Sequence, residues 1–455
     1  LFLNKIGHQA LSYLILFAKR EDTCYWYPPI YPYLKMNYLK RILIFLFVGL
    51  SCITLNAKKS DPKTILVVSG WQDVNIGDIA HTPGLLHILE TYLPDANIIV
   101  WEKNVGKEVE EFLYKNFPRI RIVHGTVDKN AQVDTQEVLK AFQTADLMIH
   151  SSGPYVVGQY HLEAWVKYTN GKPFGIFGTT IPKVDNRLKN LLEQADFIYT
   201  RETASIDVLK QAGITGTHIR FVPDATFFFN LHDKKKGNAF LKANGLEKGK
   251  FICAVPRLRR TPYYRIKNRH LWSEAKICEV EAYNNKYKEE DHSKLREAII
   301  SWVRETKNKV LVCPEMTYQV DFMDELLIDS LPADVKPYVV KRGYWLPDEA
   351  ASVYAASFAV LSFECHSPII AAANGIPFFY LRQPDDTIKG QMYYDLGYSD
   401  WIFEIEETTG TQIANRLTEI EIHYPDAKRK VITSQQEISD IYKKACMSIR
   451  NLLYQ

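Results

Sequence analysis

The sequence predicts an α/β protein of two Rossmann-like domains, whose parallel sheets face each other across a cleft. Three observations lead to this prediction. The chain has 455 residues, which is more than one hydrophobic core usually accommodates. Short apolar runs alternate with helical patterns, as expected for parallel strands covered by helices on both faces. This alternation stops once, around residues 232–250, and then starts again.

The first domain is expected over residues 58–240. Each apolar run is short and continuous, which is typical of a strand buried on both faces. Strands are predicted at 64–70, 97–102, 121–125, 146–152, 174–180 and 197–200. Helices are predicted between and after them at 78–91, 105–116, 134–143, 159–168, 185–194 and 203–212.

A stretch rich in Lys, Gly and Asn, residues 232–250, marks the junction, and the second domain is expected over residues 246–425. Its strands are predicted at 251–255, 309–313, 338–341, 359–363 and 378–381. Its helices are predicted at 291–306, 318–329, 347–355, 366–373 and 387–396. Residues 426–455 read as one long helix or a pair of helices that packs back across the first domain.

The N-terminal region is read as two segments that precede the domains. Residues 1–35 show no clear period, and we expect them to be upstream sequence translated from a misplaced start. Residues 36–57 combine a basic start, an apolar run of about fourteen residues and a small residue at Ala57, which is the pattern of a signal peptide. The alternatives are a signal anchor or a lipid at Cys52. We therefore expect a periplasmic or secreted protein that meets a membrane only through this segment.

Charge and cysteine content exclude several classes of function. The formal net charge is +3, which argues against nucleic-acid binding through a broad basic field. Five scattered cysteines follow Ala57 and no CxxC pair occurs, so neither a disulfide framework nor a structural zinc site is expected.

Two polar loops follow predicted strands of the first domain. In the loop 70–78, Asn75, Gly77 and Asp78 stand where free N–H groups at a helix start favour an anion or a sugar hydroxyl. The alternative is that Asn75 shapes a turn and Asp78 caps the helix. Ser152 and Gly153 follow the strand at 146–152, where a tight strand-to-helix turn is an equally good interpretation. The glycine spacing is not that of a dinucleotide-binding fingerprint.

Polar residues also follow the last strand of this domain. Residues 200–205, Thr-Arg-Glu-Thr-Ala-Ser, and residues 222–225, Val-Pro-Asp-Ala, place polar groups at the same sheet edge. Helix capping explains Ser205 and Asp224 as well as ligand contact does.

A basic cluster follows the first strand of the second domain. Arg257, Arg259 and Arg260 come first, and guanidinium groups bind carboxylate and phosphate with paired hydrogen bonds. The cluster continues with Arg265, Lys267, Arg269 and His270. The loop suits an anionic donor or an acidic polysaccharide, and a solvated basic loop is the alternative.

A histidine is expected where the strand at 359–363 ends. His366 would begin a helix there and face the cleft, where an imidazole exchanges protons near neutral pH. Glu364 and Glu315 are placed to orient or tune it, and Lys389 follows the next strand with another cation. The alternative is a buried, hydrogen-bonded histidine. Cys365 is not expected to be a nucleophile, because adjacent strand residues point to opposite faces.

Together these segments resemble the polysaccharide pyruvyl transferase family, which is similar in fold to GT-B glycosyltransferases. The resemblance runs from about residue 64 to about residue 400 and rests on residues 75–78, 200–205, 222–225 and 362–366, and on Gly-Ile-Pro at 375–377. It implies transfer of a pyruvyl group from phosphoenolpyruvate to two hydroxyls of a sugar in a surface polysaccharide or exopolysaccharide, with no metal and no further cofactor.

The resemblance also implies roles for individual residues. His366 matches the functional histidine of the family, Lys389 matches a recurrent lysine, and Arg257 lies where the family places a donor-binding arginine. Asn75, Gly77 and Asp78 would shape the acceptor side. Arg259 and Arg260, from the basic cluster, are added to the donor side, and Ser152 and Gly153 to the acceptor side.

The chain departs from the family pattern in three respects. Glu364 stands where the family usually has an arginine, the glycine-rich run after the fourth strand is reduced to Ser151-Ser152-Gly153, and an export signal is at odds with a cytoplasmic donor. A carboxylate repels phosphoenolpyruvate. Two alternatives therefore stay open: a GT-B glycosyltransferase and an exported glycan-binding protein without catalysis.

Overall fold

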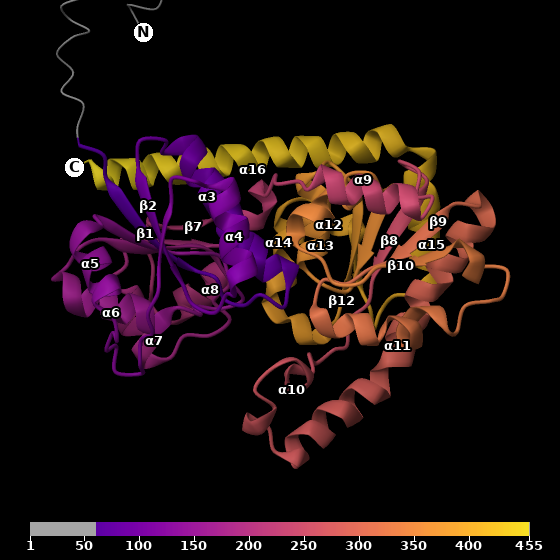
Figure 1. Cartoon of the computed structure of the whole chain (residues 1–455), viewed down its shortest axis with the longest axis horizontal. Coiled ribbons are helices and arrows are strands. Elements are labelled where there is room, and N and C mark those ends of the chain that lie inside the picture. The colour runs from indigo at the N-terminus through magenta and orange to yellow at the C-terminus, as the bar shows by residue number, and fades with distance from the viewer. Residues whose placement is uncertain (1–60, 455) are drawn as a thin grey trace, which may run out of the picture. The chain divides into compact units, whose positions relative to one another are not determined.

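The computed structural model describes residues 61–454, and these form two parallel sheets, each covered by helices (Figure 1). The first sheet has seven strands in the order β3-β2-β1-β4-β5-β6-β7. Its strands are β1 Thr64–Ser69, β2 Asn97–Glu102, β3 Arg121–Val123, β4 Leu147–His150, β5 Phe174–Thr179, β6 Phe197–Thr200 and β7 Ile219–Phe221. The helices of this half are α3 Ile76–Tyr92, α4 Lys107–Asn116, α5 Gln136–Thr144, α6 Gln159–Thr169, α7 Asn186–Leu192 and α8 Thr203–Gln211.

The second sheet has six strands in the order β10-β9-β8-β11-β12-β13. These are β8 Phe251–Val255, β9 Lys309–Val312, β10 Val339–Lys341, β11 Ala359–Ser362, β12 Phe378–Arg382 and β13 Ile402–Glu404. Its α-helices are α9 Lys234–Ala243, α10 Tyr263–Ile266, α11 Glu274–Thr306, α12 Pro347–Tyr354, α13 His366–Ala373, α14 Gln391–Asp395 and α15 Gly410–Ile422. The last helix, α16, spans Tyr424–Leu453. The shorter helical turns are η1 Ala225–Phe228, η2 Arg269–Leu271, η3 Thr317–Asp321, η4 Asp324–Ile328, η5 Lys336–Tyr338, η6 Pro384–Gly390 and η7 Ser399–Trp401.

Both sheets therefore have the doubly wound strand order of Rossmann-like domains, which confirms the predicted fold class. In each sheet the order reverses between the first and fourth strands, β1 and β4 in one and β8 and β11 in the other. Ligands of open α/β sheets bind beyond the carboxyl ends of the strands at this point. The loops that follow these four strands are the predicted polar segments.

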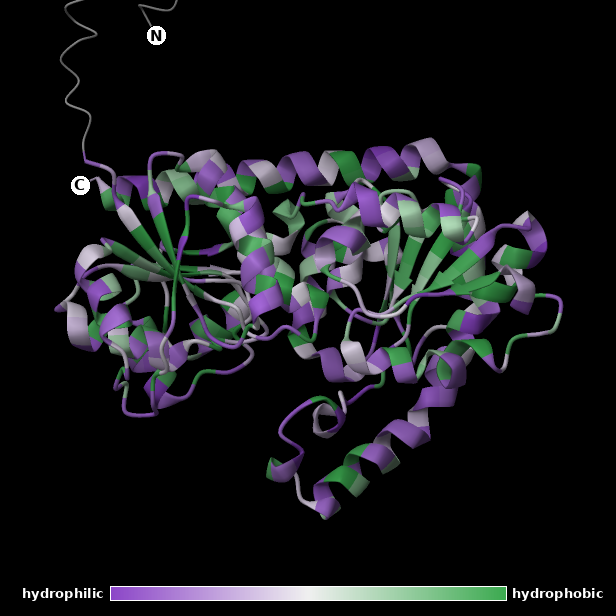
Figure 2. Ribbon diagram, viewed as in Figure 1, coloured by the Kyte–Doolittle hydropathy of each residue, from purple (hydrophilic) through white to green (hydrophobic). Residues whose placement is uncertain are grey.

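Hydrophobic residues concentrate on the strands of both sheets, whereas the helices mix hydrophobic with hydrophilic residues (Figure 2). One buried apolar cluster runs through both halves and includes Ile79, Phe227 and Ile369. A second cluster packs against the opposite face of the first sheet. Because the first cluster continues from one half to the other, Pro62–Gln455 forms one compact unit.

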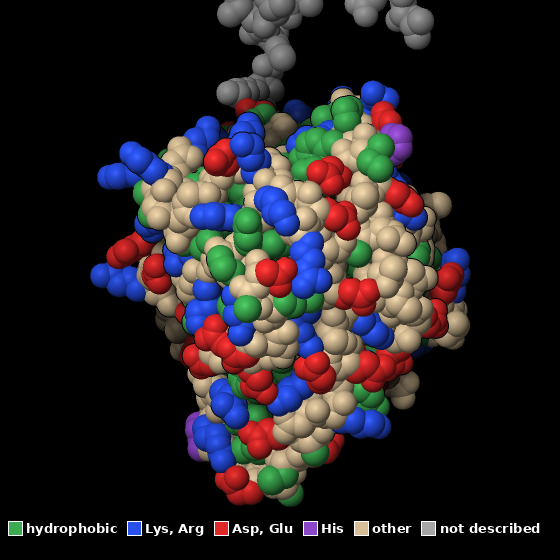
Figure 3. Space-filling model, turned by 90° about the vertical axis from the view of Figure 1, so that its right-hand side faces the viewer, with side chains coloured by type: hydrophobic (Ala, Val, Ile, Leu, Met, Phe, Trp, Pro, Cys, Tyr) green, Lys and Arg blue, Asp and Glu red, His purple; other side chains and the backbone are tan. Residues whose placement is uncertain are grey.

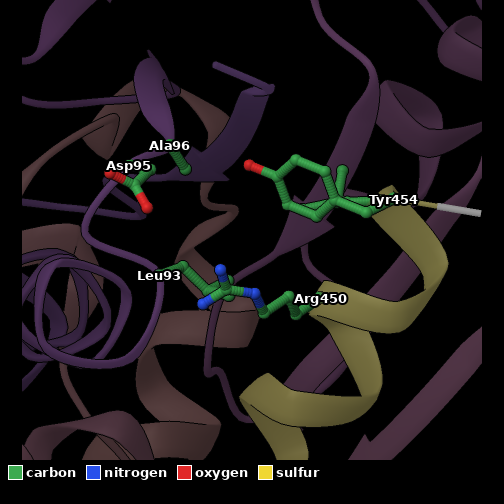
Figure 4. A pocket seen from close by; sticks show the side chains of 6 residues that line it. Leu93, Asp95, Ala96, Arg450 and Tyr454 are labelled. Atoms are coloured by element: carbon green, nitrogen blue, oxygen red, sulfur yellow. The ribbon is translucent and has the colours of Figure 1, made fainter. Parts of the chain in front are cut away.

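Helix α16 runs along both halves and ends beside the first sheet (Figure 1), as predicted for the C-terminal segment. The Tyr442 hydroxyl donates to the carbonyl oxygen of Asp224 at 2.6 Å, and Tyr92 of α3 bonds Ser439 at 2.7 Å. Near its end, Arg450 and Tyr454 line a small hollow opposite Leu93 (Figure 4). Its volume of about 10 Å³ has room for about one water molecule.

The largest difference from the predicted elements is α11, which begins at Glu274 rather than near residue 291. Ser273 caps it by accepting from the Lys276 N–H at 3.2 Å. The added turns project from the second sheet together with α10 (Figure 1). Most side chains of this arm, residues 259–290, are polar, so no apolar period marks a helix there.

Smaller differences follow from short or weakly apolar segments. The three-residue strands β7 and β13 and the helices α9 and α15 were not predicted, and residues 318–329 form 3₁₀ and π turns instead of an α-helix. Helix α9 has a single buried residue, Gly237, which explains why its sequence reads as a junction.

Surface charge is mixed on the face shown in Figure 3, where Lys and Arg side chains lie among Asp and Glu side chains. Within residues 61–454, no helix has both the length and the apolar character that a membrane crossing requires. The predicted signal segment at 36–57 and Cys52 lie outside the described residues.

Candidate functional site

The loop after β1 carries one wall of the site and is anchored to the second domain. Asn75 caps α3, and its side-chain oxygen accepts from the N–H groups of Gly77 at 2.7 Å and Asp78 at 3.3 Å. The Ile76 N–H donates to the carbonyl oxygen of Glu315 at 3.0 Å. The cap of α3 is therefore Asn75, whereas the alternative interpretation had assigned the cap to Asp78. The same loop also joins the two domains through the Ile76 hydrogen bond.

Gly77 allows the backbone of α3 to approach the ring of His366. A Cβ atom at position 77 would lie 2.1 Å from Cγ and 2.2 Å from Nδ1 of that ring, much closer than any real contact. The absence of a side chain is therefore required here for close approach. The sequence predicted that His366 faces the cleft, with a buried, hydrogen-bonded histidine as the alternative. In the structure the ring contacts the other domain, is only 9% exposed and is hydrogen-bonded, as in that alternative.

His366 is the first residue of α13, and a buried carboxylate holds its Nδ1 side. Glu315 Oε1 lies 3.2 Å from Nδ1 of His366. The other oxygen of Glu315 accepts from the N–H of Ser367 at 2.6 Å and from its hydroxyl at 2.8 Å. Burial alone would lower the pKa of His366, but the nearby carboxylates of Asp224 and Glu315, the second of them hydrogen-bonded to Nδ1, raise it well above its ordinary value.

The opposite nitrogen of His366 meets residues of the first domain. Nε2 of His366 lies 3.0 Å from Nε2 of His81 and 3.8 Å from Oδ2 of Asp224. The same Oδ2 lies 3.2 Å from Nε2 of His81 and accepts from Arg201 Nη1 at 2.8 Å. Both ring nitrogens of His366 therefore have protein partners.

A second set of charges surrounds Arg257, at the end of β8. Its Nη1 lies 2.5 Å from Asp386, and Lys389 Nζ contacts the same carboxylate oxygen at 2.7 Å. Its Nε lies 3.5 Å from Glu364 Oε2 and is buried without a hydrogen-bond partner among the described residues. Gln319 donates to the other oxygen of Glu364 at 2.7 Å. The two predicted cations thus meet at one acid, Asp386, which was not predicted.

Glu364 is buried between these charges. Burial raises its pKa to about 7, although the positive charge of Arg257 opposes the shift. Burial also opposes ionisation of Asp386, but Arg257 and Lys389 hold its pKa well below the ordinary value. The Arg257 group therefore contains a permanent anion and a carboxyl that titrates near neutrality.

Arg259 and Arg260 are directed to other partners. Arg259 makes paired hydrogen bonds at 2.8 Å with Asp291 and also bonds Glu406 at 2.6 Å. Arg260 bonds Glu279 at 2.8 Å and lies over the ring of Tyr283. These contacts tie the start of the loop to α11, so the structure does not bring the two predicted donor ligands together with Arg257. The partners of Arg260 lie in the unpredicted first turns of α11, and the partner of Arg259, Asp291, lies 32 residues away in the sequence, so spacing along the sequence did not show these pairings.

Ser152 and Gly153 join strand ends within the first domain. The Ser152 hydroxyl accepts from the Ala225 N–H at 2.9 Å, and its carbonyl oxygen accepts from the Trp71 indole at 2.6 Å. Gly153 forms a bridge with Thr179. These contacts match the alternative interpretation of a tight turn, and they support the loops that carry Trp71 and Asp224.

Asp78, which the resemblance assigns to the acceptor side, lies in the first turn of α3 and links to the arm. Its carboxylate accepts from the Gln72 amide, and Oδ1 lies 3.9 Å from Nδ1 of His81. Gln72 also approaches the Tyr263 hydroxyl at 3.5 Å and accepts from Lys267 at 3.3 Å. The arm of the second domain therefore reaches the first loop of the first domain.

His81 is the main residue of this site that the sequence analysis missed. It follows Gly77 by four residues and Asp78 by three, so a helix places all three on one face. That spacing was the available signal. The signal was weak, because the residues that His81 contacts, Asp224 and His366, are far away in the sequence.

Comparisons with known proteins agree with this architecture. Residues 75–384 match the family model described as polysaccharide pyruvyl transferase. No curated protein matches the chain. Similar solved structures include a glycosyltransferase from Rickettsia africae, with 13% identity, a TM-score of 0.55 and coverage of 86% of this chain and 97% of that one.

Two further structures share the fold at 12% identity. Anabaena HepE in complex with UDP-glucose has a TM-score of 0.54, with coverage of 86% of this chain and 100% of that one. The UDP-GlcNAc 2-epimerase of Neisseria meningitidis bound to UDP-GlcNAc has a TM-score of 0.51, with 85% and 100% covered. These likenesses show a GT-B-like fold. The family match begins at Asn75, the cap of α3, includes the His366 segment and extends over most of both domains, and the chain belongs to the polysaccharide pyruvyl transferase family.

Proposed function

We propose that this transferase moves a pyruvyl group from phosphoenolpyruvate onto two hydroxyls of a sugar in a polysaccharide, giving a pyruvate ketal and inorganic phosphate. Membership of the family supports the reaction class. The donor carries a carboxylate and a phosphate, so its site needs buried cations with free N–H groups.

One observation carries the assignment of the donor side. Nε of Arg257 is a buried guanidinium N–H without a hydrogen-bond partner among residues 61–454, and a buried unpaired donor is costly. An oxygen of an anionic ligand would satisfy it. Lys389 contacts the same carboxylate as Arg257, so it adds positive charge at the same place.

The reaction requires one proton on the methylene carbon of the donor and removal of the hydroxyl protons. In the first step a hydroxyl adds across the double bond, and the proton it loses is matched by the proton that the methylene carbon gains. In the second step the other hydroxyl replaces phosphate, and its proton leaves with the phosphate. We assign delivery of the methylene proton to His366, through the position that its Nε2 now shares with His81. Glu364, next to Arg257, is the second candidate for this role.

The test uses the full chain, phosphoenolpyruvate and a galactan acceptor. The expected result is phosphate release matched by a ketal methyl signal in the proton spectrum of the polymer. Turnover of UDP-glucose without turnover of phosphoenolpyruvate would instead support the glycosyltransferase alternative. Galactan binding with no turnover of either donor would support the glycan-binding alternative.

A further inference from the structure

We propose that His81, Asp224 and His366 form a binding site for a divalent transition metal ion, for which Zn²⁺ is the representative. The three side chains come from α3, from the loop before η1 and from the start of α13. Their donor atoms lie within 4.8 Å of one another, and all three residues are buried. The inference does not depend on the donor or the acceptor of the transferase.

The spacing of the three atoms fits a metal ion. Nε2 of His81 and Nε2 of His366 are 3.0 Å apart, and Oδ2 of Asp224 lies 3.2 Å from the first and 3.8 Å from the second. A circle through three points with these separations has a radius of about 2.0 Å, which equals the usual distance from zinc to nitrogen or carboxylate oxygen. An ion slightly outside the plane of the three atoms would reach all of them at bonding distance and keep a further position open.

Carboxylates stand behind both imidazoles. Oε1 of Glu315 lies 3.2 Å from Nδ1 of His366, within hydrogen-bond distance. Oδ1 of Asp78 lies 3.9 Å from Nδ1 of His81, which is too far for a hydrogen bond, and this Nδ1 is buried without a hydrogen-bond partner among the described residues. Histidines that bind metal through one nitrogen usually donate the other N–H to a carboxylate or carbonyl, which fixes the tautomer. The ligand mixture of two imidazoles and one carboxylate selects transition metals over Mg²⁺ and Ca²⁺, which prefer oxygen.

Charge balance also favours an ion over a shared proton. Three carboxylates, those of Asp78, Asp224 and Glu315, lie within 3.9 Å of the imidazole nitrogens. Arg201 offsets one of these charges at Asp224. Two Nε2 atoms 3.0 Å apart have room for one proton between them, which adds a single positive charge. A divalent ion adds two and leaves the buried group closer to neutral.

The contact that most opposes metal binding is that of Arg201, because its Nη1 donates to the same Oδ2 of Asp224 that would bind the ion, at 2.8 Å. A carboxylate oxygen has two lone pairs, so one can accept from Arg201 while the other faces the imidazoles. The second oxygen, Oδ1, accepts from the Thr226 N–H at 3.0 Å. These bonds fix the carboxylate as a single-oxygen ligand.

The test measures metal binding by the full chain. Bound metal is first removed with a chelator, and any affinity tag is cleaved off. Titration calorimetry with Zn²⁺ is expected to give one ion per chain, and Co²⁺ is expected to give visible absorption bands of low-symmetry coordination. His81→Gln and Asp224→Asn should abolish the stoichiometric ion. Glu315→Gln should weaken binding by roughly 10–100-fold. The matched control is His161→Gln, a buried histidine against Trp101, which should bind as the unaltered chain does.

His81→Cys gives a readout that does not rely on loss of binding. A thiolate at position 81 should produce a sulfur-to-cobalt charge-transfer band, measured in a Cys278→Ser background because Cys278 is exposed. Absence of a bound ion in the unaltered chain, or unchanged binding in both His81→Gln and Asp224→Asn, would overturn the proposal. In either case the transferase assay is unaffected, since it uses protein without added metal. If the ion binds, it takes the lone pair through which His366 would hold its proton, so Zn²⁺ should inhibit turnover in the unaltered chain.

Discussion

Gly77 of the first domain packs directly against the imidazole of His366 in the second, so closely that even a methyl group at position 77 would overlap the ring. The two domains therefore hold this imidazole jointly. Asn75 caps the helix that carries Gly77, and the neighbouring Ile76 N–H donates to the carbonyl oxygen of Glu315, whose side chain holds the ring from behind. The geometry at His366 depends on this contact between domains.

Gly77→Ala should therefore cost far more activity than stability. The added Cβ has to displace the ring or separate the domains, and overpacking of this kind costs about 1–3 kcal/mol of unfolding free energy. We expect turnover to fall at least 100-fold, because a displacement of a reacting group by about 1 Å has an effect of this size. Gly343→Ala is the control, because nothing lies within 4 Å of its added Cβ. Equal activity of the two variants would show that the ring is free to move.

Arg257→Gln should raise the KM for phosphoenolpyruvate and lower kcat/KM by about 100- to 1000-fold, the range seen when a preorganised donor to a reacting anion is removed. The physical reason is the loss of the unpaired buried Nε–H. Arg260→Gln removes a guanidinium of the same loop that bonds Glu279 instead, and it should change kcat/KM less than twofold. Similar losses of kcat/KM in Arg257→Gln and Arg260→Gln would mean that the total charge of the loop matters, and not the position of Arg257.

Glu364→Gln should tighten donor binding. Its carboxylate lies 3.5 Å from Nε of Arg257, where it competes with an anionic donor and repels it by about 2–4 kcal/mol at the effective dielectric of such sites. The KM for phosphoenolpyruvate should drop by at least about tenfold at pH 8 with little change in kcat. If instead kcat fell and KM stayed constant, Glu364 would be the proton donor. Glu279→Gln, at an exposed ion pair with Arg260, is the control.

The hypothesis that residues 36–57 form an export signal leads to a further testable outcome. If residues 36–57 are a signal peptide, mass spectrometry of protein recovered from the native host should find a chain that begins at Lys58. An intact N-terminal segment on cytoplasmic protein would contradict this and would give the enzyme direct access to phosphoenolpyruvate.

The fold was predictable because each central strand is mostly apolar. β1, β4, β8 and β11 are buried along nearly their whole length, so continuous apolar runs identify them without tertiary information. Residues that follow a strand, such as Arg257 and His366, are placed by the topology alone.

The rest depends on how distant segments meet. His81 lies inside a helix with no motif around it, and its partners, Asp224 and His366, become visible only when the domains are docked. Arg259 resembles Arg257 in sequence context, but it is paired by Asp291 of α11, 32 residues further along the chain. Local patterns contain no information on such pairings.

Glu102 should make stability fall as the pH rises. It ends β2, it is 5% exposed, and neither of its carboxylate oxygens has a hydrogen-bond partner among the described residues. Burial, assisted by Glu110, raises its pKa to about 8. Between the unfolded value near 4.5 and this folded value, the folded chain binds the proton and the unfolded chain does not, so each unit of pH costs about 1.4 kcal/mol at most.

The free energy of unfolding should consequently drop by about 1–3 kcal/mol between pH 5.5 and pH 7.5 through this group. Glu102→Gln removes the ionisation and should flatten that part of the profile, measured by urea unfolding at both pH values. Glu111→Gln, on the exposed face of α4, should keep the slope of the unaltered chain. A slope that persists in Glu102→Gln would mean that Glu102 is ionised in the folded protein with a cation or water as its partner. The carboxyl group is therefore expected to be neutral in the native state below about pH 8.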